Sequence, residues 1–444
     1  MRRPSSAWSL DWPDPARGRL QALLLGAWLC SSWPLAAAGG PRAEASGNQA
    51  GCGPAGAADG DRFSADSGHA WKGGPQTTNW WWQVSFASPR PVGAILQVQG
   101  DHPFVFTNAP ARYAWQASLD GHSWHELSAT RVADEQRCFR LHRLPASVQC
   151  RFLRLTIEAA AGEYPTLREV EFFPETQAIV SFPDWFIVVN TTHERWLPNH
   201  GQEFIPLARS TPEGKGLQAQ QVWLTSFDEA FVSAEPRPLC AFLSGNFKDW
   251  CEIDRRWWCG TEQVLQAKRL PMWASCGGAQ GLALLAEYGT AKAWDCPHCR
   301  DPDHPKTPIY THIGHTAHKP CGDYSACEFE RGKFAVRQIS ADPVFAGLPP
   351  AFESMESHCG QIEWAPAGWE LVATAGPGTK TRTQCLRLKD HPVYAAQFHI
   401  EMSGTPEVSK QIMSNFLGLA KAWGGYNPHG KATPMRPPWS APDR

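Results

Sequence analysis

The 444-residue sequence has few charged side chains, almost no net charge and no clear membrane-spanning run. Charged residues make up 19% of the chain, and the formal net charge is −2. This balance gives no broad electrostatic basis for binding nucleic acid or an anionic membrane, so we expect no nucleic-acid partner. The apolar stretch 20–35 contains Pro34 and two Ser residues and is barely long enough to span a bilayer.

The N-terminus has the pattern of an export signal. Arg17 and Arg19 precede the apolar stretch 20–35, and three alanines follow it at 36–38. We therefore predict a signal peptide over residues 1–38 and a secreted or periplasmic location. The 14 cysteines fit such an oxidising compartment.

Residues 59–174 contain short alternating segments separated by turn residues, and no helix of useful length. The clearest segments are 80–86, 92–98, 113–118 and 151–157. This pattern predicts an all-β sandwich. We expect the Ala- and Gly-rich residues 39–58 to be a linker, and Cys138 and Cys150 to close a hairpin.

The order of these segments resembles the discoidin domain, also called the coagulation factor (F5/8) type C domain. The matching marks are the Trp-rich strand ending near Phe86, the segment 118–124 and the strand starting at Arg151. The resemblance implies a galactose-binding-like sandwich that binds a glycan or a lipid head group through loops at one end. The alternative is a sandwich that only packs on its neighbour, with the Trp side chains filling its core.

Residues 177–425 read instead as alternating strands and helices. Apolar segments such as 186–189 and 239–243 are typical of buried parallel strands, and 406–423 has the periodicity of an amphipathic helix. These features predict an α/β doubly wound domain. Residues 426–444 are expected to be a disordered tail.

Cys276 lies where an apolar strand is followed at once by a helix. Small residues surround it, and Leu282 and Leu285 can share one face of the helix. A thiol at such an elbow faces the first N–H groups of the helix, which lower its pKa and can stabilise an oxyanion. The alternative is a buried cysteine that acts as a small apolar side chain.

A second motif lies 123 residues further along, in the apolar segment that ends at Glu401. We predict that 393–401 is a strand, so that His399 and Glu401, two residues apart, project to the same side. Glu401 would then orient His399, which would accept the proton of Cys276.

Together the two motifs resemble those of class I glutamine amidotransferases and of the related gamma-glutamyl hydrolases. The family patterns are Gly-x-Cys-x-Gly-x-Gln and Gln-Phe-His-Pro-Glu. We interpret Ser275 as a replacement of the first Gly and Ile400 as a replacement of the Pro. The resemblance implies a flavodoxin-like α/β fold and a Cys-His-Glu triad that forms a thioester.

The same resemblance suggests residues that support the chemistry. Gly245, in the turn after the strand at 239–243, and Gly277 would donate backbone N–H groups to the oxyanion. Gln280 and His358 would contact the substrate. No cofactor is required for catalysis of this type.

These observations predict an exported cysteine-dependent amide hydrolase that acts on glutamine or a γ-glutamyl amide. No synthetase region is recognised in the sequence, so we expect hydrolysis rather than transfer of ammonia. The alternative is a catalytically silent carbohydrate- or surface-binding protein that uses the amidotransferase-like fold as an interaction module.

The segment 294–333 is a Cys- and His-rich insertion. Cys296 and Cys299 have the Cys-x2-Cys spacing of zinc sites, and Cys321 and Cys327 follow with a wider spacing. The four side chains are therefore candidates for a structural zinc site. A pair of disulfides and four reduced thiols are the alternatives.

Overall fold

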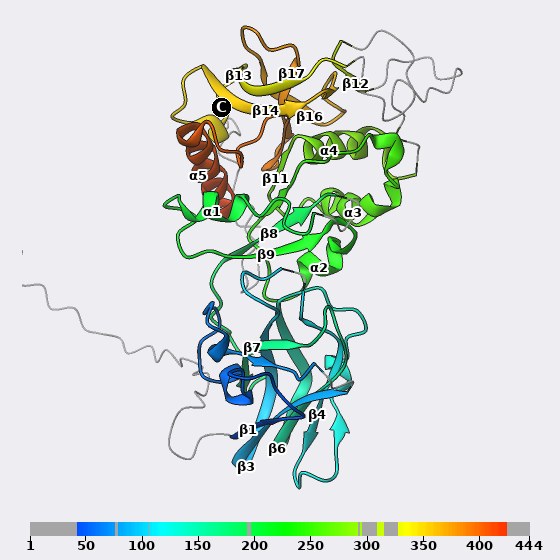
Figure 1. The fold of residues 1–444 in the computed structure, drawn as a ribbon, viewed down its shortest axis with the longest axis vertical. Helices are drawn as coiled ribbons and strands as arrows, with labels where there is room; N and C mark the ends of the chain where they lie inside the picture. Colours follow the sequence, from blue (N-terminus) through cyan, green and yellow to red (C-terminus); the bar gives the residue numbers. More distant parts are fainter. Residues whose placement is uncertain are drawn as a thin grey trace, which may run out of the picture. The chain divides into compact units, whose positions relative to one another are not determined.

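The computed structural model describes residues 42–75, 79–105, 107–192, 197–291, 294, 309–314 and 327–423. The strands in these ranges form two large sheets, of seven and nine strands, and a separate two-stranded pair (Figure 1). The predicted signal peptide 1–38 and the tail 426–444 lie outside the described residues. None of the described helices is long and apolar enough to cross a membrane.

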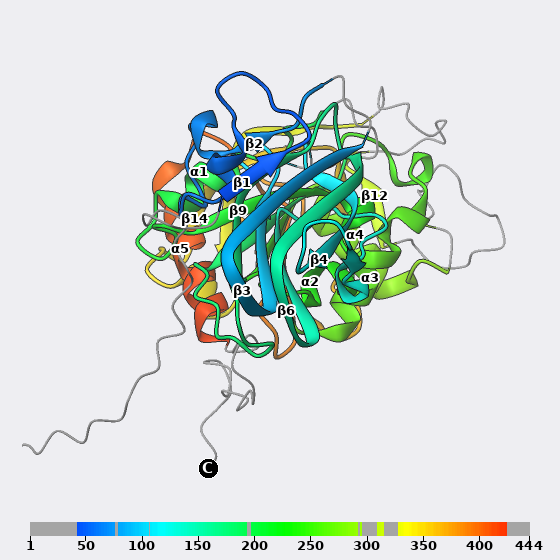
Figure 2. The same ribbon diagram turned by 90° about the horizontal axis from the view of Figure 1, so that it is seen from below.

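The first sheet is antiparallel, and two long strands dominate it, β3 and β6, which run side by side in Figure 2. The segments 80–86 and 92–98, predicted as two strands, are parts of β3, which continues through shifts in register. The core contains three fully buried tryptophans, Trp71, Trp82 and Trp115. The strands are β1 (Arg42–Ala45), β2 (Trp71–Lys72), β3 (Trp80–Gln99), β4 (Pro110–Ser118), β5 (His125–Glu126), β6 (Phe139–Ala160) and β7 (Thr166–Phe173).

Two predictions for this region were wrong. Residues 42–58 are not a linker: β1 pairs with β3, and the indole N–H of Trp82 donates to the Pro54 carbonyl at 2.9 Å. Small apolar side chains such as Ala57 can be buried there, which is why the composition resembled a linker. Cys138 and Cys150 do not close a hairpin, because residues 139–160 form one strand and both thiols are free.

The second sheet is parallel on one side and antiparallel on the other. Its order is β14-β13-β16-β17-β18-β11-β10-β8-β9, and β18 to β9 are parallel neighbours. The parallel strands are β8 (Trp185–Asn190), β9 (Gln218–Trp223), β10 (Ala241–Leu243), β11 (Met272–Ser275) and β18 (Val393–Ala396). The others are β13 (Glu330–Gln338), β14 (Ala351–His358), β16 (Trp369–Ala375) and β17 (Thr383–Leu388), while β12 (Tyr310–His312) pairs with β15 (Gly360–Ile362).

Helices cover both faces of the second sheet (Figure 1). Every residue of β8 is buried, because alternate side chains enter two different cores. Ile187 packs in the core that contains α2 (Glu229–Ser233), α3 (Cys259–Ala267) and α4 (Gly277–Tyr288). Phe186 packs in the core that contains α1 (Phe204–Arg209) and α5 (Pro406–Ala422). This pattern explains the continuous apolar runs seen in the sequence.

Arg137 connects the two sheet regions. Its guanidinium donates to the Phe231 carbonyl and, at 2.5 Å, to the Pro236 carbonyl, both on the side of the second sheet. The group also lies 5.3 Å from the centre of the Trp185 ring. A buried cation needs such acceptors to offset its lost hydration.

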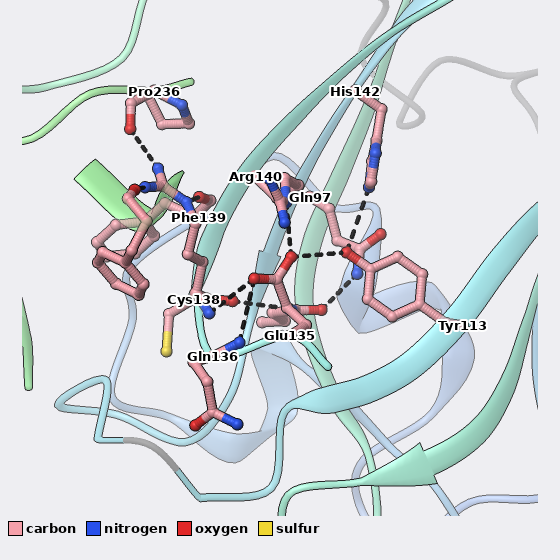
Figure 3. Close-up of polar contacts among 12 residues, drawn as sticks. Gln97, Tyr113, Glu135, Gln136, Cys138, Phe139, Arg140, His142 and Pro236 are labelled. Atoms are coloured by element: carbon pink, nitrogen blue, oxygen red, sulfur yellow. Dashed lines mark hydrogen bonds and ion pairs between the residues drawn. The ribbon is translucent and has the colours of Figure 1, made fainter. Parts of the chain in front are cut away.

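Next to Arg137, the carboxylate of Glu135 is also buried and fully engaged (Figure 3). It accepts from Arg140 Nε at 2.6 Å, from the backbone N–H of Arg137 at 2.9 Å and from the Tyr113 hydroxyl at 3.2 Å. These bonds hold the segment before β6 in place, and with it the side chain of Arg137.

Candidate functional site

Cys276 occupies the tight turn between β11 and α4, as the sequence predicted. Its backbone has φ 50° and ψ −114°, a conformation that non-glycine residues rarely adopt. The strain is held by neighbouring structure, including a 2.7 Å hydrogen bond from its N–H to the Ala396 carbonyl. This is the geometry of a nucleophile elbow, which presents a side chain at the end of a sheet.

The glycines after Cys276 let α4 approach the loop that follows β10. A Cβ atom on Gly277 would lie 2.4 Å from the backbone N of Asn246, and one on Gly278 would lie 2.6 Å from the Ser244 carbonyl oxygen. At Gly281 it would lie 2.2 Å from the Trp258 ring. Larger side chains would therefore push the helix and its N-terminal N–H groups away from the site.

His399 and Glu401 form a close pair at this elbow. His399 Nδ1 lies 2.6 Å from Glu401 Oε1, and both side chains are largely shielded from solvent. Burial lowers the pKa of His399, but the charges of Glu401 and Cys276 outweigh it and raise the pKa well above 6.5. Burial alone would raise the pKa of Glu401, yet the interaction with His399 lowers it below its usual value.

The structural reason for this pairing differs from the predicted one. The strand β18 ends at Ala396, so His399 and Glu401 lie in the bend after it and not on one strand face. His399 is held by its own N–H, which donates to the Met355 carbonyl at 2.8 Å. Ile400 is buried in the core below, where an apolar side chain suffices.

Ser275 has a role that the sequence pattern did not reveal. Counted back from Cys276, the first glycine of the family pattern falls on Ala274, so Ser275 does not replace it. The Ser275 hydroxyl donates to Glu401 Oε2 at 2.9 Å and accepts from Trp273 Nε1 at 3.1 Å. Ser275 thereby fixes the carboxylate oxygen that His399 does not contact.

Gly245 lies against the side chains of Cys276 and His399. A Cβ atom there would be 3.3 Å from His399 Cε1 and 3.8 Å from Cys276 Cβ. Its carbonyl accepts from the Thr191 hydroxyl at 2.5 Å and lies 3.1 Å from His200 Nε2. Thr191 and His200 were not predicted, because nothing local in the sequence connects them with this loop.

The remaining predicted contacts, Gln280 and His358, line the same pocket but are held by the protein. The Gln280 amide accepts from Trp250 Nε1 at 3.1 Å and donates to the Gly360 carbonyl at 2.9 Å. His358 Nδ1 also lies 2.9 Å from that carbonyl, and its Nε2 lies 2.9 Å from a Glu356 carboxylate oxygen. These groups therefore position the wall of the pocket.

The pocket beside Cys276 has a volume of about 480 Å³. Backbone and apolar groups form much of its wall, with charged side chains at Glu203, Lys248 and Arg331. It is large enough for a small-molecule ligand.

Of the four predicted zinc ligands, Cys296, Cys299 and Cys321 lie outside the described residues. Cys327 is described, and its sulfur lies near His312 and Cys359, neither of which was predicted as a ligand. Cys276, Cys359 and Cys385 are among the free thiols of the described residues.

Comparison with known proteins assigns a class to the first sheet region. A sequence model of the F5/8 type C domain matches residues 42–170, so the first sheet region is a domain of this class. Part of the chain is similar to glutamine-hydrolysing GMP synthases, which supports a class I glutamine amidotransferase-like region.

The glutamine-hydrolysing GMP synthase of Thermosipho melanesiensis is 32% identical over 93 residues, which are 20% of this chain and 17% of that protein. A glutamine-hydrolysing GMP synthase subunit from Thermoplasma acidophilum is 30% identical over 94 residues, 21% of this chain and 45% of the relative. The chain thus spans less than half the length of each.

Among solved structures, one of a putative GMP synthase subunit from Thermoplasma acidophilum aligns with 55% of this chain and 97% of its own, at 19% identity and a TM-score of 0.40. The structure titled CpGH89CBM32-6, produced by Clostridium perfringens, aligns with 32% of this chain and 99% of its own, at 18% identity and a TM-score of 0.26.

Proposed function

We propose that this protein is a cysteine-dependent amide hydrolase whose second region, residues 177–425, is a doubly wound domain of the class I amidotransferase type. The observation that carries the proposal is the strained Cys276 at the start of α4, beside the close His399–Glu401 pair in one pocket. A purely structural cysteine would not require this constellation. The proposed substrates are glutamine and γ-glutamyl amides.

The proposed reaction follows from the roles of these groups. The Cys276 thiolate attacks the carboxamide carbon, and the C–N bond breaks as His399 gives its proton to the departing ammonia. A water molecule then cleaves the thioester, losing its proton to His399 and releasing the carboxylic acid. The raised pKa of His399 favours the imidazolium that the first step needs.

The proposed oxyanion donors are the backbone N–H groups of Gly245 and Gly277. Neither N–H donates to an acceptor within the part of the chain that the structure describes. Gly277 is also the first residue of α4, where the helix dipole favours negative charge.

The test compares Cys276→Ala with Cys385→Ala, which changes a buried thiol in β17. Hydrolysis of glutamine and a panel of γ-glutamyl amides is followed by ammonia release, and a thioester on Cys276 is sought by mass spectrometry. We expect Cys276→Ala to abolish turnover and Cys385→Ala to retain it. A folded Cys276→Ala protein with wild-type activity would refute the mechanism and favour a silent binding module.

We also propose that the F5/8 type C domain binds a glycan. Trp81 and Trp124 are both partly exposed and flank the Arg154 guanidinium, whose carbon lies 4.0 Å from the centre of the Trp124 ring. Such a cluster offers apolar ring surface next to hydrogen-bond donors. Trp124→Ala should lose glycan-array binding, whereas Trp364→Ala, an exposed tryptophan in the second region, should retain it. Binding to lipid vesicles but not glycans would reject this ligand class.

Export is the third part of the proposal, and it rests on the sequence pattern of residues 1–38. The test is N-terminal sequencing of the protein recovered from an exporting host. A mature N-terminus after the three alanines at 36–38 is expected, and an intact N-terminus in the cytoplasm would reject it.

A further inference from the structure

We propose that His312, Cys327 and Cys359 bind one zinc ion at the wall of the pocket that contains Cys276. The inference concerns a site that the amide-hydrolase proposal does not use. It also differs from the zinc site predicted by spacing, with which it shares only Cys327.

The three side chains come from separate segments that meet in space. One ligand atom from each lies within 4.8 Å of the other two. A tetrahedral zinc ion, with Zn–S of about 2.3 Å and Zn–N of about 2.0 Å, needs ligand atoms roughly 3.5–3.8 Å apart. Small side-chain movements therefore suffice to close the site around an ion.

Backbone hydrogen bonds hold these segments in register. His312 is opposite Gly360 in the β12–β15 pair, and the Ile313 N–H donates to the Cys359 carbonyl at 2.8 Å. The Glu328 N–H donates to the Ile313 carbonyl at 2.9 Å, which places Cys327 beside the same turn. The site is thus preorganised, which lowers the entropic cost of binding a metal.

A buried carboxylate beside the histidine supplies the independent support. Asp249 is 1% exposed, and its Oδ2 lies 3.5 Å from His312 Nε2 but accepts no hydrogen bond from the described residues. Its other oxygen accepts from the Tyr310 hydroxyl at 3.3 Å. A carboxylate next to the ring is the usual outer partner of a metal-binding histidine, because it fixes the ring orientation and raises its basicity.

The ligand chemistry selects the ion. Two thiolates and one imidazole form a soft to borderline donor set that favours zinc over calcium or magnesium, which prefer oxygen. The ion would fix Cys359 and hence Gly360, whose carbonyl is the acceptor for Gln280 beside the nucleophile. The proposed role is therefore to hold the pocket wall.

The experiment measures metal content in the full-length protein, purified without chelator. His312→Gln and Cys359→Ser should each lose about one equivalent of zinc relative to wild type, and Cys385→Ser should lose none. Cobalt substituted for zinc in wild type should give the charge-transfer absorption of thiolate ligands, and this absorption should be absent in Cys359→Ser. Circular dichroism confirms that each variant is folded.

If the variants do not fold, differential alkylation of the wild type provides the same test. Cys327 and Cys359 should react only after a chelator is added, whereas the partly exposed Cys259 should react equally with and without it. Three results would overturn the proposal: a Cys327–Cys359 disulfide in unreduced peptides, chelator-independent alkylation of both thiols, or zinc that is retained in His312→Gln and Cys359→Ser but lost in Cys296→Ser.

Discussion

Ser275 joins β11, the strand before the proposed nucleophile Cys276, to Glu401, the carboxylate that pairs with His399. Its hydroxyl donates to Glu401 Oε2, on the side of the carboxylate opposite His399. A hydrogen bond to a charged acceptor contributes about 1.5–3 kcal/mol, so the position is worth testing by itself.

We predict that Ser275→Ala lowers kcat/KM about tenfold without unfolding the protein, because Glu401 loses one of its two partners. Glu401→Gln should have the larger effect, since it removes the charge that raises the pKa of His399. Losing that charge lowers the pKa of His399, so the alkaline limb of the pH–activity profile should move to lower pH in Glu401→Gln. An unmoved alkaline limb would contradict this role.

A second prediction concerns Glu169, a buried carboxyl on β7. Burial, and then the charge of Glu171, raise its pKa to about 8. Its stabilising contribution is therefore complete below pH 4.5 and is lost as the pH rises towards 8. In urea unfolding, the free energy of unfolding of Glu169→Gln should match that of wild type at pH 5. At pH 8.5 it should exceed that of wild type by roughly a few kcal/mol.

The control for this experiment is Glu158→Gln, which changes an exposed carboxyl on β6. The free energy of unfolding of this variant should change between pH 5 and pH 8.5 by the same amount as that of wild type. A stability gain for Glu169→Gln that is the same at both pH values would show that ionisation of Glu169 is not its source.

At the scale of elements, α4 depends on close approach to its neighbours. A methyl group at Gly281 would meet the Trp258 ring, while one at Gly418 in α5 would meet nothing within 4 Å. Gly281→Ala should therefore destabilise the protein by about 1–3 kcal/mol through overpacking. Gly418→Ala should stabilise it by about 0.5–1 kcal/mol, because alanine restricts the unfolded chain.

Thermal unfolding of these two variants measures the expected loss and the expected gain of stability in one experiment. If both variants changed the stability by the same amount, helix propensity alone would account for the effect, and the contact with Trp258 would contribute nothing. Gly281→Ala should also slow alkylation of Cys276, because a displaced α4 moves its N-terminal N–H groups away from the thiol.

The elements also show which features the sequence could reveal. The elbow at Cys276 and the helix after it were predictable, because a strand, a small-residue turn and a helix follow one another directly. β3 was predicted as two strands because Pro89 and Pro91 suggest breaks. The structure places Pro89 in the register shift between Ser85 and Arg90, where a residue without an N–H does no harm, and pairs Pro91 with Gln149.

Other parts of the site could not be predicted from local pattern. His312, Cys327 and Cys359 are separated along the chain and meet through the pairing of β12 with β15 and the hydrogen bonds of Ile313 to Cys359 and Glu328. Local spacing instead drew attention to Cys296 and Cys299. The bend that pairs His399 with Glu401 follows the end of β18. Strand periodicity therefore predicted correctly that the two side chains are neighbours, but they are brought together by the bend and not by a strand.

At the scale of the whole molecule, Arg137 is the clearest connection between the two sheet regions. Replacing Arg137 with Met leaves the carbonyls of Phe231 and Pro236 without this donor. The free energy of unfolding should therefore fall by about 2–4 kcal/mol. We expect one calorimetric transition in wild type and two in Arg137→Met, because the regions would then unfold separately.

The matched control is Arg269→Met, which removes an exposed ion pair with Glu229. Exposed ion pairs contribute little to stability, so this variant should keep a single unfolding transition. Its free energy of unfolding should fall by less than about 1 kcal/mol. Two transitions in wild type would show that Arg137 does not couple the regions.

The hydrogen bonds of Arg137 to two backbone carbonyls also have an evolutionary consequence. Main-chain carbonyls are supplied by every amino acid, so substitutions at positions 231 and 236 cannot delete them while the backbone keeps its path. At this contact only the side chain at position 137 has to be retained. Positions 231 and 236 can therefore vary without loss of this contact, whereas side chains that share the core at the junction, such as Phe139 and Trp185, are constrained by each other.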